Sequence, residues 1–127
     1  MLPEWPAGTV AVLATTGPHS IPVSTATRAG DTTIHLALAH SRESLRRLRE
    51  EPRCALTVLA AGVAVTAYGT ASVVDQDDRV AYVRLEVDEV ADHDQPTFQL
   101  DDGVRWHWTD DGAEQGDAQV RAALRRL

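Results

Sequence analysis

The chain contains no lysine, and this absence excludes several kinds of chemistry. All twelve basic side chains among its 127 residues are arginine. A Schiff-base lysine and a phosphate-loop lysine are therefore ruled out. Any anion that binds here must be held by arginine, hydroxyl groups and backbone amides. Arginine suits that task because its planar fork matches the oxygens of a phosphate.

Cysteine and long apolar runs are also scarce. Cys54 is the single cysteine, so no internal disulfide can form, and we expect a reducing, cytoplasmic location. Because Cys54 opens an apolar segment, we expect a buried, inert thiol rather than a nucleophile. No apolar run approaches the roughly 20 residues of a membrane span, and the N-terminal residues lack the features of a signal peptide.

Charge and missing motifs narrow the function further. The net charge of −7 argues against a nucleic-acid partner, which requires a basic face. The sequence has no nucleophile-elbow motif and no glycine-rich dinucleotide motif, and its five histidines lack metal-site spacing. We therefore expect no metal, no membrane partner and one globular domain over residues 1–127, long enough to bury a core.

The apolar patterning that is present predicts a mainly β fold. Short apolar or alternating segments, separated by turns rich in glycine and aspartate, predict strands over residues 9–15, 21–28, 33–39, 54–59, 63–74, 80–90 and 104–109. Gly69 lies inside one of these segments and indicates a bulge or a close backbone approach. About seven strands, mostly linked as hairpins, favour an antiparallel barrel, because closure protects strand edges.

Two helices complete this pattern. One is expected within residues 41–54, after the third strand and before Pro52, and the other over residues 117–127. In the first helix, Leu45 and Leu48 form an apolar stripe beside several arginines. The simplest interpretation is a surface helix with solvated arginines.

The start of the first helix also suits a phosphate, because a helix begins with unpaired N–H groups and a partial positive charge. Ser41 can act as its N-cap, Ser44 adds a hydroxyl, and Arg42 places a full charge in the first turn, which Glu43 opposes. Later in the chain, Trp106 and Trp108 alternate along an expected strand and so face one side. They cover either the barrel, a subunit interface or an aromatic ligand.

The order of three segments resembles a known family. The chain reads Gly17-Pro18-His19-Ser20-Ile21-Pro22-Val23-Ser24-Thr25, then Ala37-Leu38-Ala39, then Ser41-Arg42 leading to Leu48-Arg49-Glu50-Glu51-Pro52-Arg53-Cys54-Ala55-Leu56. This order is similar to that of the pyridoxamine 5'-phosphate oxidase-like superfamily, the split β-barrels that bind flavin or deazaflavin. The resemblance covers about residues 8–74.

The resemblance implies an antiparallel split β-barrel that binds its cofactor in a groove at a homodimer interface. The implied cofactor is FMN, with the 8-hydroxy-5-deazaflavin coenzyme as the alternative. The resemblance places the implied site residues as follows: Pro22, Val23, Ser24 and Thr25 beside the ring and ribityl chain, Ala37, Leu38 and Ala39 along the phosphate arm, Ser41, Arg42, Ser44 and Arg47 at the phosphate, and Thr66, Trp106 and Trp108 at the ring or substrate.

The implied function is an FMN-binding oxidoreductase or flavin-binding protein that acts on an unknown small molecule. The alternatives are a deazaflavin-dependent reductase and a cofactor-free binding protein. Related oxidases usually carry a lysine early in the first helix, and here Arg42 or Arg46 would replace it. No basic substrate-binding segment follows, so we do not expect synthesis of pyridoxal phosphate. The flavin itself carries the redox chemistry, so no catalytic residue is assigned.

Overall fold

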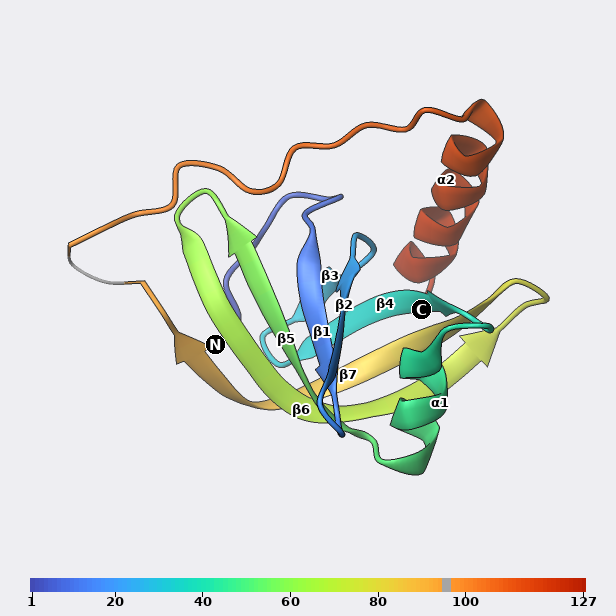
Figure 1. Cartoon of the computed structure of the whole chain (residues 1–127), viewed down its shortest axis with the longest axis horizontal. Helices are drawn as coiled ribbons and strands as arrows, with labels where there is room; N and C mark the ends of the chain where they lie inside the picture. The colour runs from blue at the N-terminus through green and yellow to red at the C-terminus, as the bar shows by residue number, and fades with distance from the viewer. Residues whose placement is uncertain (95–96) are drawn as a thin grey trace.

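A computed structural model describes residues 1–94 and 97–127, and these contain seven strands and two helices (Figure 1). In chain order they are β1 (Ala11–Thr15), β2 (His19–Val23), β3 (Thr27–Gly30), β4 (Thr33–Ala39), α1 (Glu43–Glu50), β5 (Arg53–Ala60), β6 (Val63–Gln76), β7 (Val80–Asp92) and α2 (Asp111–Arg125). None of the helices in these described ranges is long and apolar enough to cross a membrane.

The strands form one antiparallel sheet in the order β2-β1-β5-β6-β7-β4-β3. The sheet curls strongly but does not close, because β2 and β3 remain as its two edges (Figure 1). The predicted split β-barrel is therefore confirmed. The long strand β6 bends where its register against β7 shifts, between Tyr68 and Gly69 and again between Val73 and Asp75.

The core follows from strand alternation. Leu13, Ile34, Leu36, Leu56 and Leu85 point inward from four different strands and are almost completely buried. Burial of each such side chain stabilises the fold by about 1.5–3 kcal/mol. Helix α1 closes one end of the barrel with its apolar stripe, since Leu45 and Leu48 join the same core cluster, as the sequence predicts.

The segment predicted as one strand over residues 21–28 is two strands. β2 ends at Val23 and β3 begins at Thr27, and they lie at opposite edges of the sheet. Residues 24–26 form the crossover between these edges. Three side chains hold it in place. The Trp5 indole donates to the Ala26 carbonyl (3.0 Å), and Arg121 donates to the Ser24 carbonyl (2.7 Å). The Thr25 hydroxyl accepts from the backbone of β4. As a result α1 follows the fourth strand rather than the third.

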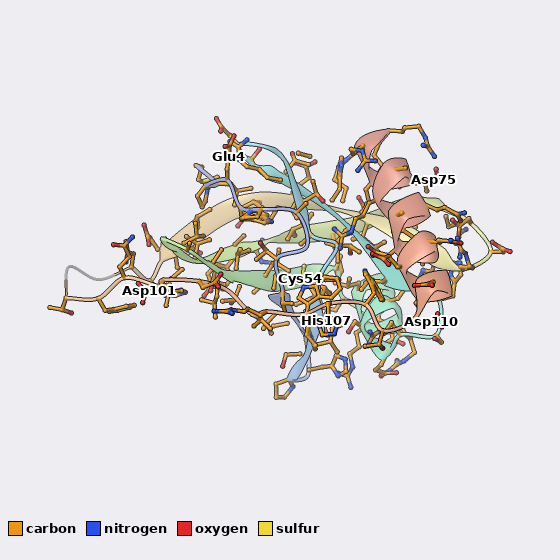
Figure 2. All side chains as sticks on the ribbon, turned by 90° about the horizontal axis from the view of Figure 1, so that it is seen from above. Glu4, Cys54, Asp75, Asp101, His107 and Asp110 are labelled. Carbon is orange, nitrogen blue, oxygen red and sulfur yellow. The ribbon has the colours of Figure 1, made fainter. Side chains whose placement is uncertain are left out.

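The strand predicted over residues 104–109 is wrong. These residues run as an extended strap across the molecule, from Asp101 past His107 to Asp110 at the start of α2 (Figure 2). The strap is anchored by side chains instead of a β-ladder, because the Trp106 indole donates to the Gly8 carbonyl at 2.8 Å.

Helix α2 begins at Asp111, earlier than the predicted start at residue 117. Asp110 is its N-cap, and its carboxylate accepts from the Ala113 amide at 2.7 Å. The helix then lays Val120 and Leu124 on the outer face of the sheet, against Tyr82 and its neighbours on β4 and β7. This packing puts α2 directly beside the crossover.

Gly69 provides a test of the bend in β6. A Cβ built at Gly69 would lie 2.0 Å from the carbonyl oxygen of Glu86 on the adjacent strand. We expect Gly69→Ala to lower the free energy of unfolding by about 1–3 kcal/mol, because the backbone must move to admit the methyl group. Urea denaturation measures this loss. Gly30→Ala is the matched control, since a Cβ there meets no atom within 4 Å. Equal stability of the two variants would contradict the steric explanation.

His35 predicts a pH dependence of stability. Its imidazole is buried on β4, accepts a hydrogen bond from Arg84 Nε at 3.1 Å, and has its pKa lowered by burial and then by the Arg84 charge. As the pH falls, the His35 imidazole is therefore protonated in the unfolded chain before it is protonated in the folded protein. The free energy of unfolding falls as the pH drops below about 6.5. Urea midpoints measured between pH 7.5 and 5.5 should fall in the wild type and fall less in His35→Gln. The exposed His107→Gln is the control, and identical slopes in all three proteins would refute this role.

Candidate functional site

A groove of about 330 Å³ lies where the crossover, the end of β4, the start of α1 and α2 meet. Nine of the predicted site residues line it, namely Pro22, Val23, Ser24, Thr25, Ala37, Leu38, Ala39, Arg42 and Trp108. The groove thus brings together segments that are separated in sequence. Its remaining walls are Val80, Asp117 and Val120, none of which the sequence pattern singles out.

The floor of the groove is fixed by Thr25. Its hydroxyl accepts from the Ala37 amide (3.1 Å) and donates to the Ala37 carbonyl (3.3 Å), so it pairs the crossover with β4 as a strand would. Both hydrogen-bonding directions of this hydroxyl are used within the protein. Thr25 therefore shapes the groove and leaves the ligand contacts to its neighbours.

Arg42 stands at the start of α1 and lines the groove. It is itself the N-cap residue, with extended backbone angles and no side-chain cap bond, so the predicted capping role of Ser41 is wrong. Within residues 1–94 and 97–127 the Arg42 guanidinium makes neither an ion pair nor a hydrogen bond. An uncapped helix start and an unpaired arginine together form an anion-attracting end of the groove.

The neighbouring arginines are engaged elsewhere. Arg46 pairs with Glu43 and with Glu50, and these contacts lower the pKa of Glu43. Arg47 pairs with Glu43 and donates to the Thr16 carbonyl in the β1–β2 turn at 2.8 Å. Neither arginine lines the groove, so Arg47 is not placed where the resemblance implies a phosphate contact.

Three predicted hydroxyl groups also lie away from the groove. Ser44 is completely buried, and its oxygen is 3.1 Å from His19 Nε2, which joins α1 to β2. Thr66 is buried on the sheet, 2.8 Å from the Thr57 hydroxyl and 2.7 Å from His93 Nε2. Ser41 is exposed beside the helix start and is not part of the groove lining.

A second hollow of about 340 Å³ adjoins the groove on the other side of residues 22–24. Trp106, His107 and Trp108 of the strap line it, together with Val10. The rings of Trp106 and Trp108 meet edge to face, with centroids 5.2 Å apart, and both are partly exposed. Trp108 lines both hollows, so the two form a continuous surface with an aromatic wall at one end.

The acidic residue in the groove is neutralised by a partner on the same helix. Asp117 Oδ2 lies 2.6 Å from Arg121 Nε, with only 14% and 18% of the two side chains exposed. Arg121 then reaches the Ser24 carbonyl with its second nitrogen. The pair therefore fixes the crossover and offsets the Asp117 charge that would otherwise repel an anion. Its i, i+4 spacing was the only trace of it in the sequence.

Reactive groups outside the groove are poorly placed for chemistry. Burial raises the pKa of the Cys54 thiol to about 11, so it stays protonated at neutral pH, and the predicted buried position is confirmed. Across the described residues, no cluster of three or more histidine, cysteine, aspartate or glutamate side chains is arranged to hold a metal ion.

Comparison with known proteins agrees with this architecture. A comparison with curated proteins finds no match. Among solved structures, the NADH:FAD oxidoreductase SgcE6 of Streptomyces globisporus C-1027 is 14% identical, with 84% of this chain and 89% of that chain covered and a TM-score of 0.55. An FAD-binding protein of Mesorhizobium loti is 15% identical, with 66% and 82% covered and a TM-score of 0.55. General Stress Protein 26 of Bacillus anthracis is 13% identical, with 78% and 90% covered and the same score.

At these identities the structural likeness shows the shared fold. The sequence itself identifies the family, because the family model described as pyridoxamine 5'-phosphate oxidase matches residues 3–103, most of the chain. The match includes the crossover, the end of β4 and the start of α1, which build the groove. This chain belongs to the pyridoxamine 5'-phosphate oxidase family.

Proposed function

We propose that this protein binds FMN in the groove and acts as a flavin-dependent oxidoreductase on a small molecule. The observation that carries this proposal is that an unpaired arginine, Arg42, and a partly exposed tryptophan, Trp108, line one groove, in which the single acidic side chain of the lining is already held in an ion pair. A planar ring that bears a phosphate arm matches this order of features. The similar proteins from Mesorhizobium and Streptomyces, described as FAD-binding and as an NADH:FAD oxidoreductase, support the flavin assignment.

The phosphate end of the proposed site depends on Arg42. Its guanidinium offers charged N–H donors, and the uncapped first turn of α1 adds backbone N–H groups and a partial positive charge. The ion pair between Asp117 and Arg121 leaves Arg42 as the unbalanced charge of the groove. These residues fit a phosphate, although the family's usual lysine is missing.

The ring end of the proposed site depends on Trp108 and residues 22–24. Trp108 supplies a flat apolar surface for stacking, and the strand backbone beside it supplies polar groups at the ring edge. When bound, FMN supplies hydride or electron transfer. The protein orients the ring, and α2 with Val120 limits the access of water to one side of it. Four of the predicted residues have no direct role in the site as a single subunit forms it, namely Ser41, Ser44, Arg47 and Thr66.

We also propose that the protein forms a homodimer. Val12 on β1 and Leu59 on β5 are 38% and 42% exposed and lie on the outer face of adjacent strands, with Trp106 partly exposed on the strap. Exposed apolar groups on adjacent strands favour burial against a second copy. The buried Thr66 belongs to this part of the sheet, so it would meet a ring only if a partner subunit presents one.

Two alternatives remain open to test. A deazaflavin coenzyme shares the planar ring and the phosphate arm, so the same groove features favour it. A cofactor-free binding protein is favoured by the engagement of Arg46 and Arg47 by Glu43, because neither of these arginines then supports Arg42 in holding an anion.

The first test is FMN affinity in Arg42→Gln. Loss of one charge-assisted contact costs about 1.5–3 kcal/mol, so we expect FMN binding to weaken roughly tenfold or more. Riboflavin lacks the phosphate, so its affinity should stay unchanged. Fluorescence titration with FMN, riboflavin and the deazaflavin coenzyme measures these affinities.

Arg49→Gln is the control for general charge, because Arg49 lies at the other end of α1, outside the groove. Equal losses in both variants would remove Arg42 from the site. A protein that binds none of the three ligands, and shows no thermal stabilisation by them, would favour the cofactor-free alternative.

The second test is the oligomeric state. We expect sedimentation at micromolar concentration to show a dimer and Leu59→Glu to show a monomer, because the substitution buries an unpaired charge in the proposed interface. Val74→Glu is the control, since Val74 is exposed to a similar degree near the far end of β6. A monomeric wild-type protein would reject the dimer and any role for Thr66 at a ring.

A further inference from the structure

A separate cavity lies near the end of α1, whereas the FMN groove lies at the start of that helix. It is a hollow of about 240 Å³ between the end of α1 and residues of β6 and β7, and Figure 1 shows β6 passing behind the helix. Its floor consists of Leu48, Ala71 and Val83, which are nearly completely buried, and Pro52 and Val73 form its sides. The interior is therefore apolar.

The mouth of this hollow is polar and positively charged. Arg49 and Ser72 line it, and both are exposed. In the described ranges, Arg49 makes no ion pair and no side-chain hydrogen bond. The acidic residue next to it in sequence, Glu50, is held by Arg46 at 2.7 Å, and the nearby Arg53 is held by Asp88. Arg49 is thus an unbalanced cation in a chain whose net charge is −7.

We propose that this hollow binds a small apolar monocarboxylate, with the hydrocarbon part on Leu48 and Val83 and the carboxylate on Arg49. The hydrocarbon part of such a ligand can enter the cavity favourably, because few polar groups of the ligand or of the cavity wall lose their contact with water. A carboxylate matches the planar fork of one guanidinium, and the Ser72 hydroxyl adds a donor at the same rim. A single cation with no second positive partner in the lining suits a monoanion better than a phosphate.

The site is independent of the FMN groove, because the two share no lining residue. They lie at the two ends of α1, with Arg42 at the start of the helix and Arg49 near its end. Each arginine is unpaired, so each serves as the matched control for the other. Failure of one proposal therefore leaves the other standing.

Methyl-detected NMR with hexanoate as the probe tests the proposal, and hexan-1-ol serves as the neutral comparison of equal chain length. Hexanoate should shift the methyl signals of Leu48, Val73 and Val83 in a saturable manner. Hexan-1-ol should bind more weakly, because it cannot form the charge-assisted bond. Arg49→Gln should weaken hexanoate binding roughly tenfold while leaving hexan-1-ol binding unchanged. The substituted side chain is exposed, so the variant keeps its fold.

Two control variants separate a contact from general charge. Arg46→Gln removes a guanidinium from the same helix that is paired with Glu43 and Glu50 and does not line the hollow. Arg42→Gln removes the unpaired arginine of the FMN groove. Both should bind hexanoate as the wild type does. The proposal is overturned if hexanoate shifts none of the three residues, if it shifts Val23 in the groove instead, or if all three arginine variants lose affinity equally.

Discussion

The arrangement of the molecule depends on one three-residue crossover between the two edges of the sheet. Residues 24–26 leave the ladder of β1 and β2 and reach β3 on the far side, so their backbone polar groups need new partners. The indole of Trp5 and the guanidinium of Arg121 donate to the carbonyl groups of Ala26 and Ser24, and the Thr25 hydroxyl ties the crossover to the backbone of Ala37 on β4. These hydrogen bonds hold the crossover backbone away from the strand ladder, and this leaves space for the groove.

Electrostatic balance then gives the groove its polarity. Helix α1 carries four arginines over residues 42–49, yet Glu43 engages two of them at the helix surface. Asp117, which enters the groove from α2, is matched by Arg121. Of these four arginines, only Arg42 and Arg49 form no ion pair within the described residues. The acidic composition of the whole protein therefore conceals two local positive positions.

The local parts of this fold were predictable from the sequence, and the parts that depend on distant partners were not. Strand β4 matches its predicted limits, the buried pair Leu45 and Leu48 follows from helical spacing, and Gly69 marks a true bend. The alternating tryptophans of the strap look like a strand, but their rings pack on each other and on Gly8, and no neighbouring strand completes a ladder. In the site, short segments were found by resemblance, whereas Asp117 and Arg121 were missed because only tertiary packing brings α2 to Ser24.

The bond between Arg121 and Ser24 joins residues 97 positions apart, and this separation bears on how the groove is made in the cell. A ribosome releases the crossover and β4 long before it releases α2, and N-terminal structure generally forms first during synthesis. The seven strands can therefore assemble while one wall of the groove is still missing. Ligand capture in this protein would then be a late event, timed by the emergence of its C-terminal helix and not by the folding of the barrel.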